Sequence, residues 1–294
     1  MRSKKKLSIP AIKGYRSALG QVFYYRGIDI SNSPEISCLI KNFEQELPKT
    51  NSLVPKWDLN LVLHSLLGKP YEPLSLATMQ NLSLKTVFLL ALASAKRISE
   101  IHGLSHVVSH TKHWHSVTLT FAQDFIAKTQ IPGKSDTAYG PIIIPSLSQI
   151  LGKGDPDNLL CPVRALKEYI RRTQGSRPSC DRLFITSHSR NQHCVSKNTI
   201  SFWIRKVIKR AYTEVSDDQA SLHRIKPHEL RAMATSLAFS HNSSLSQVMA
   251  AASWRCHTTF VSHYLRDVSH KFMDVFSLGP LVAGQHLIQP PSSS

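Results

Sequence analysis

The chain has 294 residues, of which 41% are hydrophobic, enough for one large domain beside a smaller one. Lys and Arg total 36 against 19 Asp and Glu, which gives a formal net charge of +17. This excess favours a polyanionic partner. A membrane surface is disfavoured, because no segment combines a clean apolar face with a dense face of Lys and Arg.

Cysteine usage and the amino-terminal residues favour a reducing compartment. The five cysteines are Cys38, Cys161, Cys180, Cys194 and Cys256. Their number is odd and no two of them form a C-x-x-C pair, so we expect neither a disulfide framework nor a zinc finger. The longest apolar run, residues 87–95, is too short to cross a membrane. The opening MRSKKKLSIP lacks the apolar stretch of a secretory signal, and its RSKKK run matches a weak nuclear import signal.

Two helices are predicted near the amino terminus, over residues 11–26 and 35–47. The first carries a stripe of apolar residues on one face, namely Ile12, Tyr15, Leu19, Val22 and Phe23. Lys13 and Arg16 lie outside this stripe, and we expect them to contact the phosphates of a nucleic acid. The polar stretch from Pro48 to Pro55 then indicates a linker.

The larger part of the chain begins with a helix over residues 57–67, which Pro70 and Pro73 end. A long helix is predicted over residues 82–104, with Arg97 near its end. After it the apolar residues alternate, which predicts a small antiparallel sheet with Lys128 on a hairpin. The alternating residues are Val117, Leu119 and Phe121, then Phe125 and Ala127, before the apolar run at 142–144.

Two further helices are predicted, over residues 162–172 and 196–212, with a short strand at 183–186 between them. The second helix has a basic face that includes Lys197, Arg205, Lys206, Lys209 and Arg210. In a protein this basic, such a face suits contact with phosphates as well as simple solvation, and we expect Lys206 and Arg210 to bind DNA. Together these elements predict a mainly helical α+β fold with a small antiparallel sheet.

The stretch 226–264 reads KPHELRAMATSLAFSHNSSLSQVMAAASWRCHTTFVSHY and predicts three short helical segments. The first starts near Pro227 and places His228 and Arg231 one turn apart on the same face. Trp254 follows the second segment, and Tyr264 lies in the third. These side chains suit attack on a phosphodiester by a tyrosine. A Tyr hydroxyl is a poor nucleophile at neutral pH, so it needs a base and a neighbouring positive charge. His228 can move the proton, and Arg231 supplies the positive charge.

The order of the motifs is more specific than any one of them. An A-x-R-x-x-E-I-x-x-L segment is followed by a hairpin Lys, then H-x-x-R, then Trp, then Tyr. This pattern resembles the tyrosine recombinase (phage integrase) family over nearly the whole chain. The segments KWDLNLVLHSL, LSLKTVFLLALASAKRISE and FIAKTQ are similar, more narrowly, to the recombinases of DIRS-type retrotransposons.

The resemblance implies a set of phosphate-binding residues. Arg97 and Arg231 would be the two arginines that hold the scissile phosphate, since a guanidinium can bind two phosphate oxygens at once. His228 matches the His of the H-x-x-R motif. Trp254 stands where most family members have His and some have Trp, and either ring can donate a hydrogen bond to the phosphate.

The resemblance also implies the groups that break and form the bonds. Tyr264 matches the nucleophile that forms a 3′-phosphotyrosyl bond and releases a 5′-hydroxyl. Lys128 best matches the hairpin Lys that protonates this leaving oxygen, and Lys134 in the same loop is a plausible substitute. No metal ion or other cofactor is implied.

The organisation that the resemblance implies has four parts. Residues 1–50 would form a partial helical core-binding domain and residues 51–56 a linker, followed by a catalytic domain over residues 57–280 and a disordered tail over residues 281–294. Two helices are few for a core-binding domain, so we expect a fragment or a truncated copy. The expected assembly is a homotetramer on double-stranded DNA, in the nucleus.

Three alternatives compete with this interpretation. Five histidines lie close together in sequence and suggest a zinc site, but Cys and acidic residues that could complete the ligand set are missing nearby. These histidines are His102, His106, His110, His113 and His115. A serine hydrolase is disfavoured because the chain has no G-x-S-x-G elbow. The strongest alternative is a catalytically silent DNA-binding protein derived from a transposon recombinase.

Overall fold

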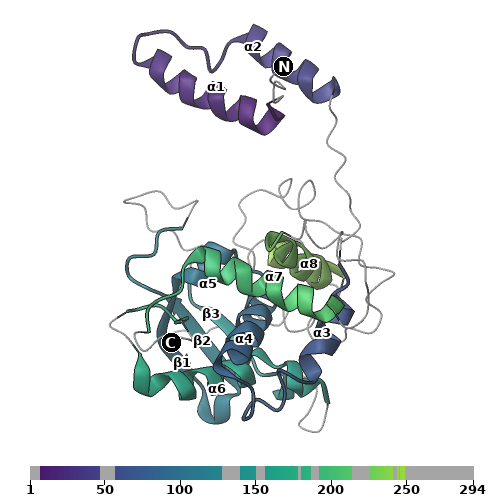
Figure 1. Ribbon diagram of the computed structural model, residues 1–294. Helices are drawn as coiled ribbons and strands as arrows, with labels where there is room; N and C mark the ends of the chain where they lie inside the picture. The colour runs from purple at the N-terminus through teal and green to yellow at the C-terminus, as the bar shows by residue number, and fades with distance from the viewer. Residues whose placement is uncertain are drawn as a thin grey trace, which may run out of the picture. The chain divides into compact units, whose positions relative to one another are not determined.

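The structure, a computed structural model, describes residues 7–46, 57–127, 140–149, 156–177, 180–186, 192–213, 226–240, 244 and 246–248. The chain divides into two compact units, Met1–Ser52 and Leu53–Ser294. The described residues are mainly helical and include a three-stranded antiparallel sheet (Figure 1). This confirms the predicted α+β class.

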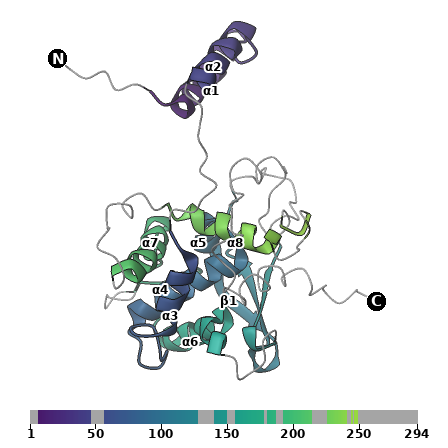
Figure 2. The ribbon, with the colours of Figure 1, turned by 90° about the vertical axis from the view of Figure 1, so that its right-hand side faces the viewer.

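The larger unit is built around α4 (Met79–Ser94), which is buried along nearly its whole length. Its apolar residues are spread over every side, as expected of a helix in the centre of a core. Other helices surround it (Figure 2): α6 (Pro162–Thr173), α7 (Lys197–Thr213) and α8 (His228–Ser240) pack on α4, and α3 (Leu59–Leu67) packs on α7. The helices predicted over 57–67, 162–172 and 196–212 are therefore confirmed.

One buried carboxylate connects the turn after α3 to two of these helices. Pro70 and Pro73 end α3 as predicted, and Glu72 lies between them. The ammonium group of Lys85, on α4, donates to Glu72 Oε1 at 2.5 Å, and Arg164, on α6, binds both oxygens of the same carboxylate at 2.6 and 2.9 Å. Burial lowers the pKa of Lys85 to about 8, although Glu72 opposes the shift.

The sheet consists of β1 (Leu104–His110), β2 (Ser116–Phe121) and β3 (Ile142–Pro145), in that order and antiparallel. Val117 and Leu119 of β2 are fully buried and pair with Ile144 and Ile142 of β3, which confirms the alternation predicted there. The predicted continuation through Phe125 and Ala127 is wrong, because these residues lie in a loop after β2. Short 3₁₀ turns occur at Lys112–Trp114, Leu147–Gln149, Pro156–Leu160 and Gln174–Ser176.

Two corrections concern the segment between α6 and α7. The strand predicted at 183–186 is wrong. Residue Ile185 in this segment forms only an isolated bridge, with Cys194, and the preceding Arg182 forms another with Ser105. Cys180 and Cys194 form a disulfide, with their Cα atoms 6.2 Å apart, whereas the sequence predicted no disulfide framework. The two cysteines are 14 residues apart, and the chain reversal that brings them together leaves no short spacing signal.

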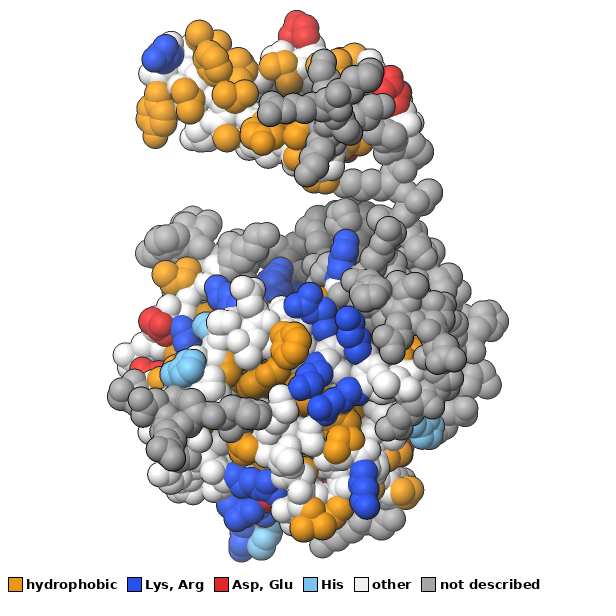
Figure 3. All heavy atoms as spheres, in the orientation of Figure 1, with side chains coloured by type: hydrophobic (Ala, Val, Ile, Leu, Met, Phe, Trp, Pro, Cys, Tyr) orange, Lys and Arg blue, Asp and Glu red, His pale blue; other side chains and the backbone are white. Residues whose placement is uncertain are grey.

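The smaller unit contains α1 (Ile9–Tyr24) and α2 (Pro34–Glu46), close to the two predicted helices. Gly20 of α1 allows the close approach of the loop before α2, because a Cβ at this position would overlap the side chain of Ser31. The predicted apolar stripe is largely exposed within the unit, with Leu19 50% and Val22 58% exposed (Figure 3).

Across the described part of the chain, no helix is both long and apolar enough to cross a lipid bilayer.

Candidate active site

The candidate site begins where α4 ends. Ala95 adopts a left-handed conformation, with φ 51° and ψ 22°, and this stops the helix after Ser94. The chain then forms α5 (Ile98–Gly103), with Arg97 as its N-cap residue. The prediction of one helix over 82–104 with Arg97 near its end is therefore wrong. Arg97 lies at the start of a second, short helix.

Glu100 fixes the start of α5 and the side chain of Arg97 together. Its Oε2 accepts the backbone N–H of Arg97 at 2.8 Å, as the N3 carboxylate does in a capping box. Its Oε1 accepts a charge-assisted hydrogen bond from Nη1 of Arg97 at 2.7 Å. The side chain of Arg97 remains 23% exposed, whereas that of Glu100 is 1% exposed. The guanidinium of Arg97 is thus held from the buried side and accessible from the other.

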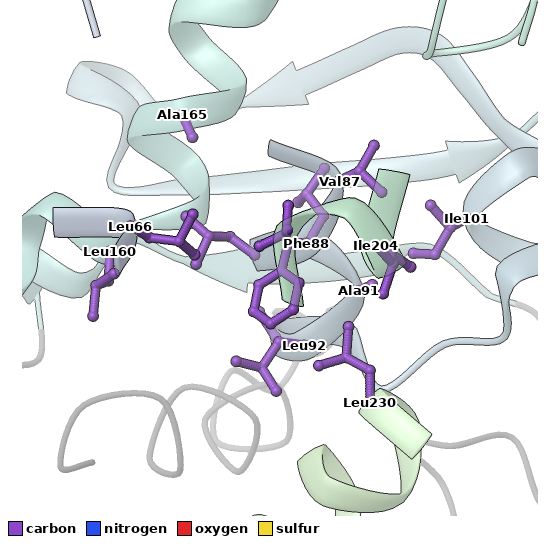
Figure 4. Close-up of a cluster of buried hydrophobic side chains, with 14 of the residues drawn as sticks. Leu66, Val87, Phe88, Ala91, Leu92, Ile101, Leu160, Ala165, Ile204 and Leu230 are labelled. Carbon is purple, nitrogen blue, oxygen red and sulfur yellow. The ribbon is translucent and has the colours of Figure 1, made fainter. Parts of the chain in front are cut away.

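Arg231 reaches the same carboxylate from α8. Its Nη1 lies 3.5 Å from Oε2 of Glu100, and its side chain is 3% exposed. The neighbouring Leu230 packs into the cluster that also contains Leu92 of α4 and Ile101 of α5 (Figure 4). This apolar contact brings α8 to the junction of α4 and α5 and thereby positions Arg231 beside Glu100.

Lys96 adds a third positive charge to this cluster. It is 8% exposed and interacts electrostatically with Glu100, Arg231 and Arg97. Burial lowers its pKa to about 8, the attraction of Glu100 opposes this shift, and the two guanidiniums add to it. The sequence interpretation missed Lys96, and it included Glu100 only as part of a motif. A cluster of one carboxylate with three cationic side chains is well suited to hold a further anion, such as a phosphate.

The remaining motif residues are only partly covered. His228 is the first residue of α8, one turn before Arg231, as predicted, but its side chain is outside the described part of the structure. Lys128, its substitute Lys134, Trp254 and Tyr264 all lie outside the described residues. The structure therefore brings Arg97 and Arg231 together, and the other four roles stay predictions.

The predicted DNA contacts in the smaller unit take part in bonds between its helices. Lys13 forms an ion pair with Glu44 of α2 at 2.7 Å, and both side chains remain about half exposed. Arg16 donates to the carbonyl of Ser31 and, at 3.1 Å, to the hydroxyl of Ser37. Both residues thus hold α1 against α2, and their contact with DNA stays a prediction.

The predicted DNA contacts on α7 lie on a basic surface. Lys and Arg side chains gather over this helix (Figure 3), and its Arg205 and Lys209 are exposed. Lys206 lies 5.9 Å from the ring centre of Phe202, which is 53% exposed. Arg210 donates to Oδ1 of Asn81 at 2.7 Å, so one end of its guanidinium is anchored to α4. Contact of Lys206 and Arg210 with DNA stays a prediction.

The crowded histidines are spread over the end of α5, β1 and the turn that follows β1. The rings of His110 and Trp114 stack with centres 4.0 Å apart, and Lys167 of α6 lies 5.8 Å from the Trp114 ring centre. Within the described ranges, no group of three or more His, Cys, Asp or Glu side chains is arranged to hold a metal ion.

No family model and no curated protein matches the sequence. Among solved structures, the chain is similar to the crystal structure of XerA recombinase, with a TM-score of 0.47 and 15% sequence identity, covering 98% of this chain and 86% of that chain.

Proposed function

We propose that this chain is a DNA strand transferase of the tyrosine recombinase type, which cleaves and rejoins duplex DNA. The observation that supports this most is the meeting of Arg97 and Arg231 at Glu100. The two arginines come from different elements and are far apart in sequence, yet both are oriented by one buried carboxylate. Guanidiniums fixed in this way are preorganised to bind the oxygens of a phosphodiester and its transition state.

The proposed reaction needs no external energy source, because each phosphodiester bond is exchanged for another. The hydroxyl of Tyr264 gives its proton to His228, the candidate base, while its oxygen attacks the phosphorus and forms a 3′-phosphotyrosyl bond. The bond to the 5′ oxygen breaks, and Lys128 or Lys134 gives that oxygen a proton. Rejoining reverses these steps with a 5′-hydroxyl from a second strand. Throughout, Arg97 and Arg231 stabilise the negative charge on the phosphate oxygens, with His228 and Trp254 as further donors.

Affinity for DNA would come mainly from charge. The formal net charge of +17 and the basic surface of α7 supply cations that can neutralise phosphates and release counterions. In the finer proposal, the chain derives from a DIRS-type element, acts in the nucleus and assembles on DNA as a homotetramer. Residues 1–50 would act as a partial core-binding domain and residues 57–280 as the catalytic domain.

A suicide substrate tests the proposal. The full chain is incubated, with and without a chelator, with nicked duplexes taken from the repeats that flank the source element, and covalent protein–DNA adducts are separated under denaturing conditions. We expect an adduct that persists with chelator and is lost in Tyr264→Phe. Tyr25→Phe, at a site 87% exposed on the smaller unit, is the matched control and should leave the adduct unchanged. Tight binding of these duplexes without any adduct would overturn the catalytic proposal in favour of the silent DNA-binding protein.

A further inference from the structure

Lys96 is a buried cation that the proposed reaction does not yet use. It lies between the left-handed Ala95 and Arg97, at the junction of α4 and α5. Its partners in electrostatic interaction are Glu100 on α5, Arg97 at the cap of that helix and Arg231 on α8. We propose that Lys96 is a third phosphate-binding cation of the candidate site, acting on the same phosphate as Arg97 and Arg231. This inference rests on the proposed function.

The charge balance of the cluster supports this role. Glu100 attracts Lys96, whereas both guanidiniums repel it. A lysine placed here only to pack would lose its hydration and also face two like charges, which makes the position costly for a purely structural residue. A phosphate at the exposed side of Arg97 would reverse the balance, because it attracts all three cations at once.

Lys85 shows what a structural buried lysine looks like in the same helix bundle. It is fully buried, its ammonium group donates to the carbonyl of Leu66 and to Glu72, and these bonds tie α4 to the turn after α3. Its neighbours include one other cation, Arg164. Lys96 differs because two arginines act on its charge, and because those arginines are the ones proposed to hold the phosphate.

The proposal implies a dependence of phosphate binding on pH. With a pKa lowered to about 8, the ammonium of Lys96 loses its proton as the pH rises through the slightly alkaline range. The charged form binds the anion better, so affinity at this site is present below that pH and is lost above it. Arg97 and Arg231 keep their charge throughout this range, because a guanidinium deprotonates only above about pH 12.

The test measures adduct formation and duplex binding by the full chain from about pH 6.5 to about pH 9.5, a range that brackets the lowered pKa of Lys96. A phosphodiester does not titrate in this range, so any step reports on the protein. In wild type, we expect the rate of adduct formation at subsaturating duplex, which reports groups of the free protein, to fall as the pH rises through about 8 once the pH dependence of Lys96→Arg has been divided out. Lys96→Met should lower that rate by roughly 10- to 100-fold at pH 7, the worth of a hydrogen bond to a charged group, and remove the step.

Two further variants keep the outcome interpretable. Lys96→Arg retains the charge, so it should keep the rate within about threefold at pH 7 and show no step near pH 8. Lys85→Met removes the structural lysine and should lower the melting temperature without changing the pH profile of the rate. An unchanged rate and profile in a folded Lys96→Met would overturn the role of Lys96 while adducts still form. Absence of adducts from wild type at every pH would overturn the proposed function itself.

Discussion

Nη1 of Arg231 lies 3.5 Å from Oε2 of Glu100, although 131 residues separate the two in sequence. Arg97 binds the other oxygen of the same carboxylate, so Glu100 sets the relative positions of both guanidiniums. One acidic side chain thus converts two distant motifs into a single anion-binding geometry. The packing of α8 and α5 on α4 holds this geometry in place, because these backbones cannot shift without opening the core.

Replacing Glu100 with Gln should therefore damage both stability and the site. The amide removes the negative charge that Arg97 and Arg231 share, and it leaves the nearly fully buried Arg231 next to a neutral group. Breaking a buried ion pair from one side costs about 3–5 kcal/mol, so we expect a loss of this size in the free energy of unfolding, measured by urea denaturation at pH 7.

The matched control is Glu168→Gln on α6. Glu168 also binds two arginines, Arg171 and Arg172, but Glu168 is 18% exposed and Arg171 is 66% exposed, so water screens these pairs more than the pairs of Glu100. A smaller loss than in Glu100→Gln is therefore expected there. Equal losses in the two variants would show that Glu100 does not organise a buried cluster.

The sequence predicted the elements whose pattern is local. The helix of residues 196–212 was clear because Ile200, Trp203, Ile204 and Val207 recur at helical spacing, and all four are buried in α7. The strand at Val117 and Leu119 was clear because apolar residues alternate along it, and these two residues are buried in β2. In each case the residues that form the sequence pattern are also the ones that pack in the core, so a short stretch of sequence is enough to predict the element.

The sequence could not show the features that depend on long-range packing. The break at Ala95 was missed because alanine is a strong helix former and neither Gly nor Pro marks the turn. Lys96 was missed because only the approach of α8 brings Arg231 close to it. The disulfide between Cys180 and Cys194 was missed because it forms across a chain reversal. Arg97 and Arg231 were found through the ordered motif, but their meeting at Glu100 was not.

Lys85 should make stability depend on pH in a characteristic direction. Burial lowers its pKa to about 8 in the folded protein, whereas the unfolded chain binds the proton up to its normal pKa of 10.5. Between these values the unfolded state binds more protons, so the free energy of unfolding attributable to Lys85 rises with pH, by up to about 1.4 kcal/mol per pH unit.

This is measured as the difference in unfolding free energy between wild type and Lys85→Met, from pH 7 to about pH 9.5, because subtraction removes the titration of all other groups. Lys167→Met, at an exposed position on α6, is the control and should give a flat difference. A difference that stays constant for Lys85→Met as well would mean that its pKa is not lowered by burial.

Gly103→Ala should destabilise the junction between α5 and β1. A Cβ at this position would lie 2.7 Å from Cγ and Cε2 of Phe125, so the ring must move. Overpacking of this kind costs about 1–3 kcal/mol, measured as the change in the free energy of unfolding. Phe125→Ala removes the overlapping ring, so the double variant should be more stable than the sum of the two single changes predicts. Simple additivity would mean that the loss has another cause.

Lys206→Ala should weaken binding to DNA in a way that depends on salt. Lys206 lies on the basic surface of α7, where its ammonium is close to the exposed ring of Phe202. If it contacts one phosphate, the slope of log K against log salt concentration becomes less negative by about one, with little dependence on DNA sequence. Fluorescence anisotropy with a labelled duplex at several salt concentrations measures this slope.

Lys167→Ala on α6 is the matched control, since its ammonium lies near the ring of Trp114 in the same kind of contact. A slope that changes equally in both variants would mean that binding follows total charge, and the α7 surface would then have no special part in holding the duplex.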